Sequence, residues 1–401
     1  MSEWKEYKLG GILQSKGYIR GPFGSALKRD ELLENGIPVY EQQHAIYNKR
    51  VFRFFINEAK YEEMRRFAVQ TDDIIISCSG TVGEVSIIKE NDPKGIISQA
   101  LLLLRVNTEL VLPNYLLFFL KSKHGHNAIV SCSSGSVQIN IAKRDVIENI
   151  PILLPSKNEQ NRIVSILSSI EEKIDLLNRE NATLDALAET LFRHYFIENP
   201  NPDWKEGKLG DVTKIGIGRT PPRKEAKWFS TSPMDLKWIS IKDMGETGVF
   251  IFNTAEYLTR EAVDCFKIPI IPIDTVVLSF KMTVGRIGIT SEAMLSNEAI
   301  AHFILDDNSP ISKEYLYIFL KLFKFETLGS TSSIVTSINS AMIKEMELII
   351  PDKDTMMLYN KQVCPLFEKI KTNQQQILSL SSQRDTLLPH LLSREVEVLG
   401  Q

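Results

Sequence analysis

Two stretches of the chain concentrate positive charge between turn-forming residues, a combination suited to holding phosphate groups. Residues 16–53 hold seven Lys or Arg against four acidic residues, and residues 214–242 hold seven against two. Glycines such as Gly21 and Gly218 interrupt both stretches. Basic side chains and backbone amides in loops of this kind can approach phosphate oxygens. The chemistry that these stretches favour is therefore the binding of nucleic acid.

Side chains that can read base edges lie near the same stretches and in two loops that follow strand-like runs, at residues 77–81 and 279–283. Amide, imidazole, hydroxyl and basic groups supply the hydrogen bonds that distinguish base pairs. Each such residue alone is more easily explained as solvated surface or turn, but the corresponding regions of the chain taken together favour DNA contact. The candidate DNA-binding residues are Lys16, Arg20, Gly24, Ser25, Lys28, Arg29, Gln42, Gln43, His44, Ser79, Thr81, Arg219, Thr220, Arg223, Lys224, Ser240, Lys242, Lys281, Thr283 and Arg286.

Motifs for catalysis or cofactor binding are missing from the sequence. There is no G-x-x-x-x-G-K-[ST] phosphate loop, no Asn/Asp-Pro-Pro-aromatic motif of amino-methyltransferases, and residues 216–221 do not form a dinucleotide fingerprint. Residues 202–208 imitate a nuclease PD…ExK pattern, but the two parts are too close to come from different strands. The histidines and the four cysteines show no nucleophile arrangement and no zinc spacing. We therefore expect no catalytic residue, no bound cofactor and no metal in this chain.

Length and composition are those of an ordinary globular protein with two domains or more. The 401 residues are 43% hydrophobic and 24% charged, enough to bury more than one core. The N-terminal residues are largely polar and the apolar runs are too short to cross a bilayer, so we expect a cytoplasmic protein. Since the formal net charge is −3, only the local basic stretches indicate a nucleic-acid partner.

The chain repeats itself at half its length. Residues 4–10 read WKEYKLG and residues 204–210 read WKEGKLG. Because solenoid repeats have much shorter periods, we interpret the pattern as one duplication of nearly the whole chain. Further matches follow in the same order, pairing residues 72–77 with 274–279, 81–85 with 283–287, 98–100 with 297–299, 115–121 with 315–321, and 150–155 with 346–351.

Each half combines a strand-rich part with a long glycine-free part. Short apolar runs separated by Gly, Pro and Ser predict a mixed α/β domain at residues 1–155 and another at residues 199–351. The glycine-free parts predict one long helix over residues 156–198 and a second over residues 352–401 with its tail. The expected fold class is α+β, with the two helices forming an antiparallel coiled coil and an internal pseudo-two-fold duplication.

Both long helices carry a heptad pattern of apolar residues, which predicts that they pair with each other. Asn181 interrupts the first pattern, and Asn373 and Arg384 interrupt the second. Buried asparagine pairs can fix the register of a coiled coil, so we place Asn181 opposite Asn373. Arg384 then faces Ile170, and we expect its charge to extend to solvent or to a partner subunit. The other predicted pairs are Leu177–Ile377, Leu184–Ile370, Leu167–Leu387, Ile163–Leu391 and Tyr195–Tyr359.

Together these features resemble the specificity subunit of type I restriction-modification enzymes. The resemblance covers essentially the whole chain and rests on the duplication, the long helices and the W-K-x-x-K-L-G openings. Each half also contains a D-x-[IV]-[IV]-[IL]-S-x-x-x-T-V-G segment and closes with [IL]-P. The first helix starts with N-E-Q-N-R-I-V-x-I-L at residues 158–167, whereas residues 355–360 depart from that pattern, which puts equal docking by both helices in doubt.

The resemblance implies that this chain recognises DNA and that partner subunits carry out the chemistry. Each half would be a target recognition domain that reads one part of a split double-stranded DNA site, with half-sites about one helical turn, ~34 Å, apart. The helices would set the gap and dock two modification subunits, which bind S-adenosylmethionine and methylate adenine. Two restriction subunits would use ATP and Mg. This chain itself would be a non-catalytic subunit with no membrane contact.

Other interpretations remain open from the sequence alone. The chain could serve a complex that only methylates DNA, or it could be a coiled-coil adaptor that binds proteins instead of DNA. An enzyme with an unfamiliar site is less well supported, because no convergent set of reactive residues is found. The bases recognised are not predictable, since readout depends on loop geometry and DNA shape.

Overall fold

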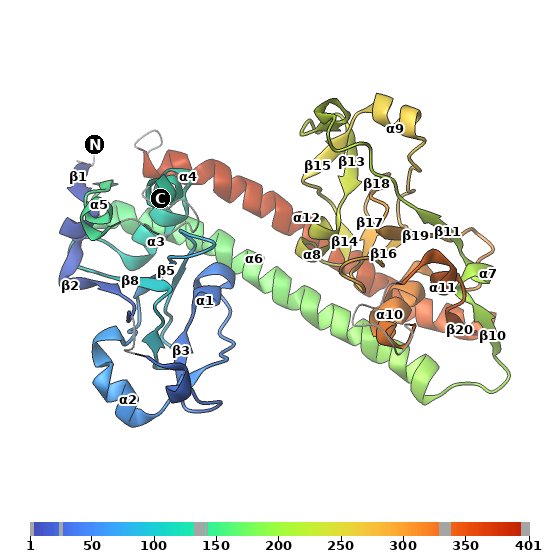
Figure 1. Cartoon of the computed structure of the whole chain (residues 1–401), viewed down its shortest axis with the longest axis horizontal. Coiled ribbons are helices and arrows are strands. Elements are labelled where there is room, and N and C mark those ends of the chain that lie inside the picture. The colour runs from blue at the N-terminus through green and yellow to red at the C-terminus, as the bar shows by residue number, and fades with distance from the viewer. Residues whose placement is uncertain (1–3, 24–26, 132–140, 142, 329–337, 394–401) are drawn as a thin grey trace. The chain divides into compact units, whose positions relative to one another are not determined.

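The computed structural model describes residues 4–23, 27–131, 141, 143–328 and 338–393 (Figure 1). It divides into two compact units, which we describe separately. Unit 1 comprises residues 1–173 and 380–401, and unit 2 comprises residues 174–379. The long helices α6 (Lys157–Phe192) and α12 (Lys353–Leu392) contribute residues to both units.

The main sheet of unit 1 separates two apolar cores. Its strands lie in the order β2 (Leu13–Arg20), β8 (Leu101–Val106), β5 (Ile74–Ser77) and β6 (Val85–Ile87), and each pair is antiparallel. Alternate residues of β5 and β8 enter opposite cores, with Ile74 and Ile76 on one side and Ile75 on the other. Because both faces are covered, these strands are continuous apolar runs instead of alternating ones.

Smaller elements of unit 1 cover the two faces of the main sheet. A second sheet has the order β4 (Phe55–Ile56), β3 (Ile37–Tyr40) and β7 (Ile96–Ile97), and a two-stranded sheet pairs β1 (Lys5–Lys8) with β9 (Pro151–Leu154). The short helices of unit 1 are α1 (Gln42–Tyr47), α2 (Glu58–Glu63), α3 (Pro113–Lys121), α4 (Lys123–Ser131) and α5 (Arg144–Glu148).

Unit 2 repeats this design, with one added strand in the main sheet and one in the second sheet among the described residues. Its main sheet has the order β11 (Lys214–Ile217), β19 (Ile300–Ile304), β16 (Val276–Ser279), β17 (Ile287–Thr290) and β14 (Phe250–Ile251). A second sheet has the order β12 (Phe229–Ser230), β15 (Glu256–Leu258), β13 (Leu236–Ile239) and β18 (Leu295–Ser296), and β10 (Lys205–Lys208) pairs with β20 (Glu347–Ile350). The short helices are α7 (Leu209–Val212), α8 (Ile241–Glu246), α9 (Arg260–Phe266), α10 (Lys313–Leu322) and α11 (Ser340–Lys344).

Equivalent hydrogen bonds confirm that the two halves are structural repeats. The Tyr115 hydroxyl donates to the Leu153 carbonyl at 3.0 Å, and the Tyr315 hydroxyl donates to the Ile349 carbonyl at 2.7 Å. Both bonds connect the helix that follows the main sheet to the strand that closes the repeat. The predicted α+β class with an internal duplication is confirmed.

Within each unit, α6 and α12 pack as an antiparallel pair (Figure 1). In unit 2 the Asn373 Nδ2 atom donates to Asn181 Oδ1 at 3.0 Å, and the rings of Tyr195 and Tyr359 are 5.9 Å apart. Both are pairs that the sequence predicts. The asparagine register is therefore confirmed in unit 2.

In unit 1 the predicted pairing of Leu167 with Leu387 is wrong. Leu387 is 37% exposed, whereas Leu388 is buried in the same core as Leu167. The deviation is local, because Ile163 and Leu391, another predicted pair, are both buried in this core. The charge of Arg384 is paired within unit 1, because its Nη1 atom lies 2.9 Å from Glu171 Oε1.

We expect the asparagine pair to show a non-additive effect on stability. Asn373 is fully buried and also donates to the partly exposed Glu180 Oε2 at 2.9 Å, so Asn373→Leu removes two hydrogen bonds and should cost about 1–2 kcal/mol. Replacing Asn181 and Asn373 together by leucine should recover that loss. Urea unfolding of the four members of this mutant cycle measures the coupling, and simple additivity would contradict the pairing.

Candidate nucleic-acid interface

One serine hydroxyl builds the hairpin loop between β5 and β6 in unit 1. Ser77 Oγ donates to the Thr81 carbonyl at 2.6 Å and accepts from the Glu84 amide at 3.0 Å. The hydroxyl therefore closes the loop from inside and leaves its apex to solvent. In the loop between β16 and β17 of unit 2 the same bonds join Ser279 Oγ to the Thr283 carbonyl at 2.6 Å and the Arg286 amide to Ser279 Oγ at 3.0 Å.

The apex of each loop has a left-handed backbone. Gly80 has φ +66° in unit 1, and the corresponding Met282 has φ +61° in unit 2. A non-glycine residue in this conformation is uncommon, and strained backbone of this kind clusters at functional sites. The Met282 side chain is 96% exposed. Met282 lies in the predicted loop 279–283 but is not among the candidate residues, although its place between Lys281 and Thr283 was a signal.

In unit 1 the structure brings Gln42 of α1 to the hairpin loop. Ser79 Oγ donates to Gln42 Oε1 at 3.3 Å, which orients the amide. A Cβ atom added at Gly80 would lie 3.9 Å from Gln42 Nε2, so this nitrogen faces the loop apex. An oriented glutamine amide can donate to N7 and accept from N6 of adenine. Gln42, Ser79 and the exposed Thr81 therefore form one group of predicted contacts.

His44 is not available to DNA, which corrects our expectation for this residue. Its side chain is fully buried, the Glu41 amide donates to Nδ1 at 2.7 Å, and Nε2 lies 2.9 Å from the Val51 carbonyl. Burial lowers the pKa of His44, so the neutral ring caps α1 from inside. Gln43 also turns back to its own segment, because its Nε2 donates to Glu41 Oε2 at 3.3 Å.

Ser240 has a corresponding structural role in unit 2. Its hydroxyl donates to Asp243 Oδ2 at 2.6 Å and accepts from the Asp243 amide at 3.2 Å, which caps α8. The buried Asp243 carboxylate also accepts from the Ala255 amide at 2.9 Å. Ser240 is therefore an unsuitable base reader, whereas Lys242 on the same helix is exposed and lies 3.8 Å from Glu246.

Arg286 holds α8 against the hairpin loop of unit 2. Its Nη1 atom donates to the Ile241 carbonyl at 2.5 Å, and a Cβ atom added at Gly245 would lie 2.4 Å from it. In unit 1 a different arginine holds the equivalent helix, because Arg50 Nη1 donates to the His44 carbonyl at 3.2 Å. The structure therefore places Arg286 as a positioning residue.

The remaining candidates of unit 2 divide into supporting and exposed residues. Arg223 stacks over the rings of Phe229 and Trp238, and its Nη1 lies 2.7 Å from Glu256. The Arg219 guanidinium donates to the Phe266 carbonyl at 3.0 Å, and the Thr220 hydroxyl donates to the Glu298 carboxylate. The exposed candidates that remain are Lys224, Lys242, Lys281 and Thr283.

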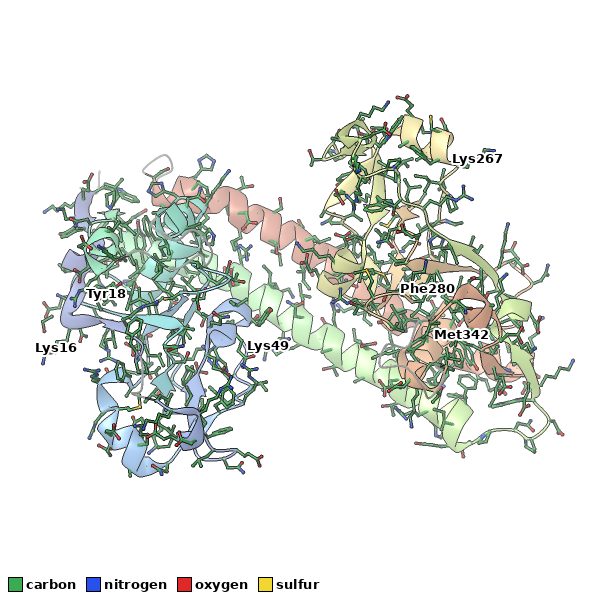
Figure 2. The ribbon with its side chains drawn as sticks, viewed as in Figure 1. Lys16, Tyr18, Lys49, Lys267, Phe280 and Met342 are labelled. Carbon is green, nitrogen blue, oxygen red and sulfur yellow. The ribbon has the colours of Figure 1, made fainter. Side chains whose placement is uncertain are left out.

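The basic stretch of unit 1 does not form one surface. Lys16 and Lys49 lie on opposite flanks of the unit (Figure 2). Lys28 and Arg29 are exposed beside the turn at residues 29–31, and Arg20 lies at the end of β2. The candidates Gly24 and Ser25 lie outside the described residues.

Gln374 of α12 ties the long helix to the main sheet of unit 2. Its Oε1 accepts from the Phe250 amide at 3.0 Å, and its Nε2 donates to the Phe250 carbonyl at 3.1 Å. These bonds satisfy the edge of β14, the strand that follows α8. Gln374 thus positions the recognition elements, and no local sequence signal could have found it because Phe250 is 124 residues away.

The residues that the structure describes contain neither a cluster of metal ligands nor a membrane-spanning helix. No group of three or more His, Cys, Asp or Glu side chains in that part of the chain could hold a metal ion. None of its helices is long and apolar enough to cross a membrane.

Buried His302 predicts that unit 2 loses stability in mild acid. The side chain is 1% exposed, Nε2 lies 2.6 Å from Ser296 Oγ, and burial lowers the pKa to about 4. Below the ordinary histidine pKa of about 6.5, this histidine is protonated in the unfolded chain but stays neutral in the folded chain. The free energy of unfolding therefore decreases as the pH is lowered. We expect a loss of about 2 kcal/mol between pH 7 and pH 5 from this residue.

Chemical unfolding at a series of pH values tests this expectation. His302→Gln should flatten the dependence between pH 7 and pH 5, whereas the same change at the exposed His194 should leave it unaltered. An unchanged slope in His302→Gln would contradict the role of His302.

Comparison with protein families finds a match in both halves of the chain. Residues 1–186 and 201–387 each match the type I restriction modification DNA specificity domain. A curated relative from Haemophilus influenzae, the type I restriction enzyme HindI specificity subunit, is 24% identical over 99% of this chain and 100% of its own length. The MjaIX specificity subunit of Methanocaldococcus jannaschii is 24% identical over 72% of this chain and 70% of its own.

A solved structure shares the fold. The S subunit of a type I restriction-modification system from M. genitalium aligns with a TM-score of 0.59 at 16% sequence identity. The alignment covers 99% of this chain and 97% of that chain. Both repeats and both long helices are thus included in the similarity.

Proposed function

This chain belongs to the family of type I restriction-modification DNA specificity domains, and from that premise we propose that each unit reads one part of a split DNA site. The observation that carries the proposal is the duplicated scaffold: a serine-closed hairpin loop beside a capped short helix, once in each unit. Such loops present side chains to base edges while buried groups fix their backbone.

The same scaffold carries different side chains in the two units, which supports different half-sites. Unit 1 presents the amide of Gln42 with the hydroxyl of Ser79. Unit 2 presents the exposed Lys281 and Met282 with Lys242 on α8. An amide suits adenine, whereas a lysine suits the O6 and N7 acceptors of guanine. An asymmetric two-part site follows from this difference.

The long helices are proposed to set the gap between the half-sites and to dock the modification subunits. Large apolar side chains remain exposed on them, which is typical of surfaces that bind protein. These side chains are Leu176, Leu187, Met357, Leu358 and Leu378. In this proposal two modification subunits bind S-adenosylmethionine and methylate adenine, and two restriction subunits bind ATP and Mg. The chain itself is a non-catalytic recognition subunit, and a complex that only methylates is the alternative.

Co-expression with a partner adenine methyltransferase tests the proposal. The host should lack its own adenine methylation, and modified-base sequencing of its DNA reads out the site. Methylated adenines in a two-part motif with a fixed unread gap are expected. An active complex whose methylation follows no split motif would overturn the proposal.

A further inference from the structure

A positively charged groove of about 620 Å³ lies on unit 1 beside β2. Its walls come from four elements: β2, the turn at residues 65–67, β8 and the start of α5. None of the lining residues that the structure describes is acidic. The cationic side chains that line it are Lys16, Arg20, Arg65, Arg66, Arg105 and Arg144.

Three of these charges are already paired with carboxylates behind or beside the groove. Arg105 lies 2.7 Å from the buried Asp73, which fixes it to the neighbouring strand. Arg144 lies 2.8 Å from Glu148, and Arg65 lies 3.1 Å from the exposed Glu62. These arginines shape the groove and keep its potential positive, but their charges are partly neutralised.

The other three charges have no carboxylate partner among the described residues. Lys16 and Arg66 are exposed, and Arg66 is held in place over the ring of Phe67 at 4.4 Å. Arg20 lies over the ring of Phe23 at 5.7 Å, its Nη1 atom is buried, and its guanidinium also interacts with the buried Cys78 thiol. Lys16 and Arg66 therefore present exposed charges with which an anion from outside the chain can pair.

Unit 2 has no equivalent of the groove in its described residues. Arg20 of β2 is the strand partner of Leu102 of β8. The equivalent strand partners in unit 2 are Ile217 and Ala301. Continuing the strand register, Arg105 corresponds to Ile304. The first residue of α5 is Arg144, whereas α11 starts with Ser340. The positive charge therefore belongs to unit 1 and not to the shared scaffold.

We propose that this groove is a phosphate site that holds the sugar-phosphate backbone of DNA. The proposal rests on the proposed function of the chain. Charges spread over four elements suit a run of phosphodiester groups better than one compact anion, and guanidinium groups bind phosphate oxygens in pairs. Unit 1 then supplies the larger share of the affinity that depends on salt, and this share carries no base specificity.

Equilibrium binding of the full chain, in complex with its methyltransferase, to a random-sequence DNA duplex tests this site. The variant K16Q/R66Q removes two exposed groove charges, and K8Q/K89Q removes two exposed charges of the same unit outside both the groove and the basic stretch. We expect the Kd of the groove variant to rise at least tenfold at low salt, and its slope of log affinity against log salt to fall by about two. The control pair should change Kd less than threefold.

Two further readouts separate this site from the proposed function and from free phosphates. In the groove variant the methylated motif should keep its sequence; a changed motif would overturn the assignment to the backbone. Equal losses in both variants, or none, would also overturn it.

Titration with inorganic pyrophosphate tests whether the groove binds free phosphates instead of DNA. If the groove variant loses only pyrophosphate binding and keeps duplex binding, the site is not for DNA. If the wild type marks no split motif but K16Q/R66Q alone weakens duplex binding, the recognition proposal fails and the groove stands.

Discussion

Replacing Gly218 with alanine will destabilise unit 2 by about 3 kcal/mol and displace the basic segment that follows β11. A Cβ atom at this position would lie 2.2 Å from the Ser296 carbonyl oxygen and 2.3 Å from that of Asn297. Both atoms belong to the backbone, so no side-chain rotation can relieve the contact. Since Arg219 and Thr220 come next, their contacts with Phe266 and Glu298 should be disturbed as well.

Gly21 should behave in the same way in unit 1, because its added Cβ would lie 1.9 Å from the Ser98 carbonyl oxygen. Gly11→Ala is the matched control, since nothing lies within 4 Å of its added Cβ. Thermal and urea unfolding measure the effect. If Gly218→Ala unfolds like the wild type, β11 does not approach β18 as closely as described.

Replacing Gln42 with alanine will relax the recognition of one base pair in one half-site. The side chain is oriented by Ser79 and faces the apex of the β5–β6 loop. A bidentate contact with a base is worth about 1–3 kcal/mol of discrimination, so about tenfold to over a hundredfold of selectivity should disappear at that position. Modified-base sequencing should show one position of the motif becoming degenerate while the other half-site is unchanged.

Gln43→Ala is the control on the same helix, because Gln43 donates to Glu41 and not to the loop. It should leave the motif as it is. Degeneracy caused by Gln43→Ala but not by Gln42→Ala would show that the base-reading face of α1 has been assigned to the wrong residue.

The duplication and the pairing of the long helices could be predicted because both appear in the sequence as residues repeated at regular spacing. A match at a spacing of 200 residues predicts a duplication, and a heptad seam interrupted by Asn181 and Asn373 predicts both the pairing and its register. The burial of Leu388 in place of Leu387 could not be predicted in this way, because both are leucines and only the packing of unit 1 decides which of them is covered.

Single site residues were less predictable, since residue type does not tell where a side chain points. His44 and Ser240 have the chemistry of base readers, yet both cap helices inside the protein. Arg286 has the charge of a phosphate ligand, yet it donates to a backbone carbonyl. The role of Gln374 could not be predicted, because only the tertiary structure shows that it binds Phe250. Burial and hydrogen-bond competition, which only the tertiary structure sets, decided these roles.

The most direct test of the account is modified-base sequencing with the two hairpin loops altered one at a time. One strain carries Gln42→Ala with Ser79→Ala, a second carries Lys281→Ala with Met282→Ala, and a third carries the wild type, each with the same methyltransferase. The account predicts a split motif in the wild type, a change confined to one half in the first variant, and a change confined to the other half in the second. A variant that alters both halves, or a wild type without a split motif, would contradict it.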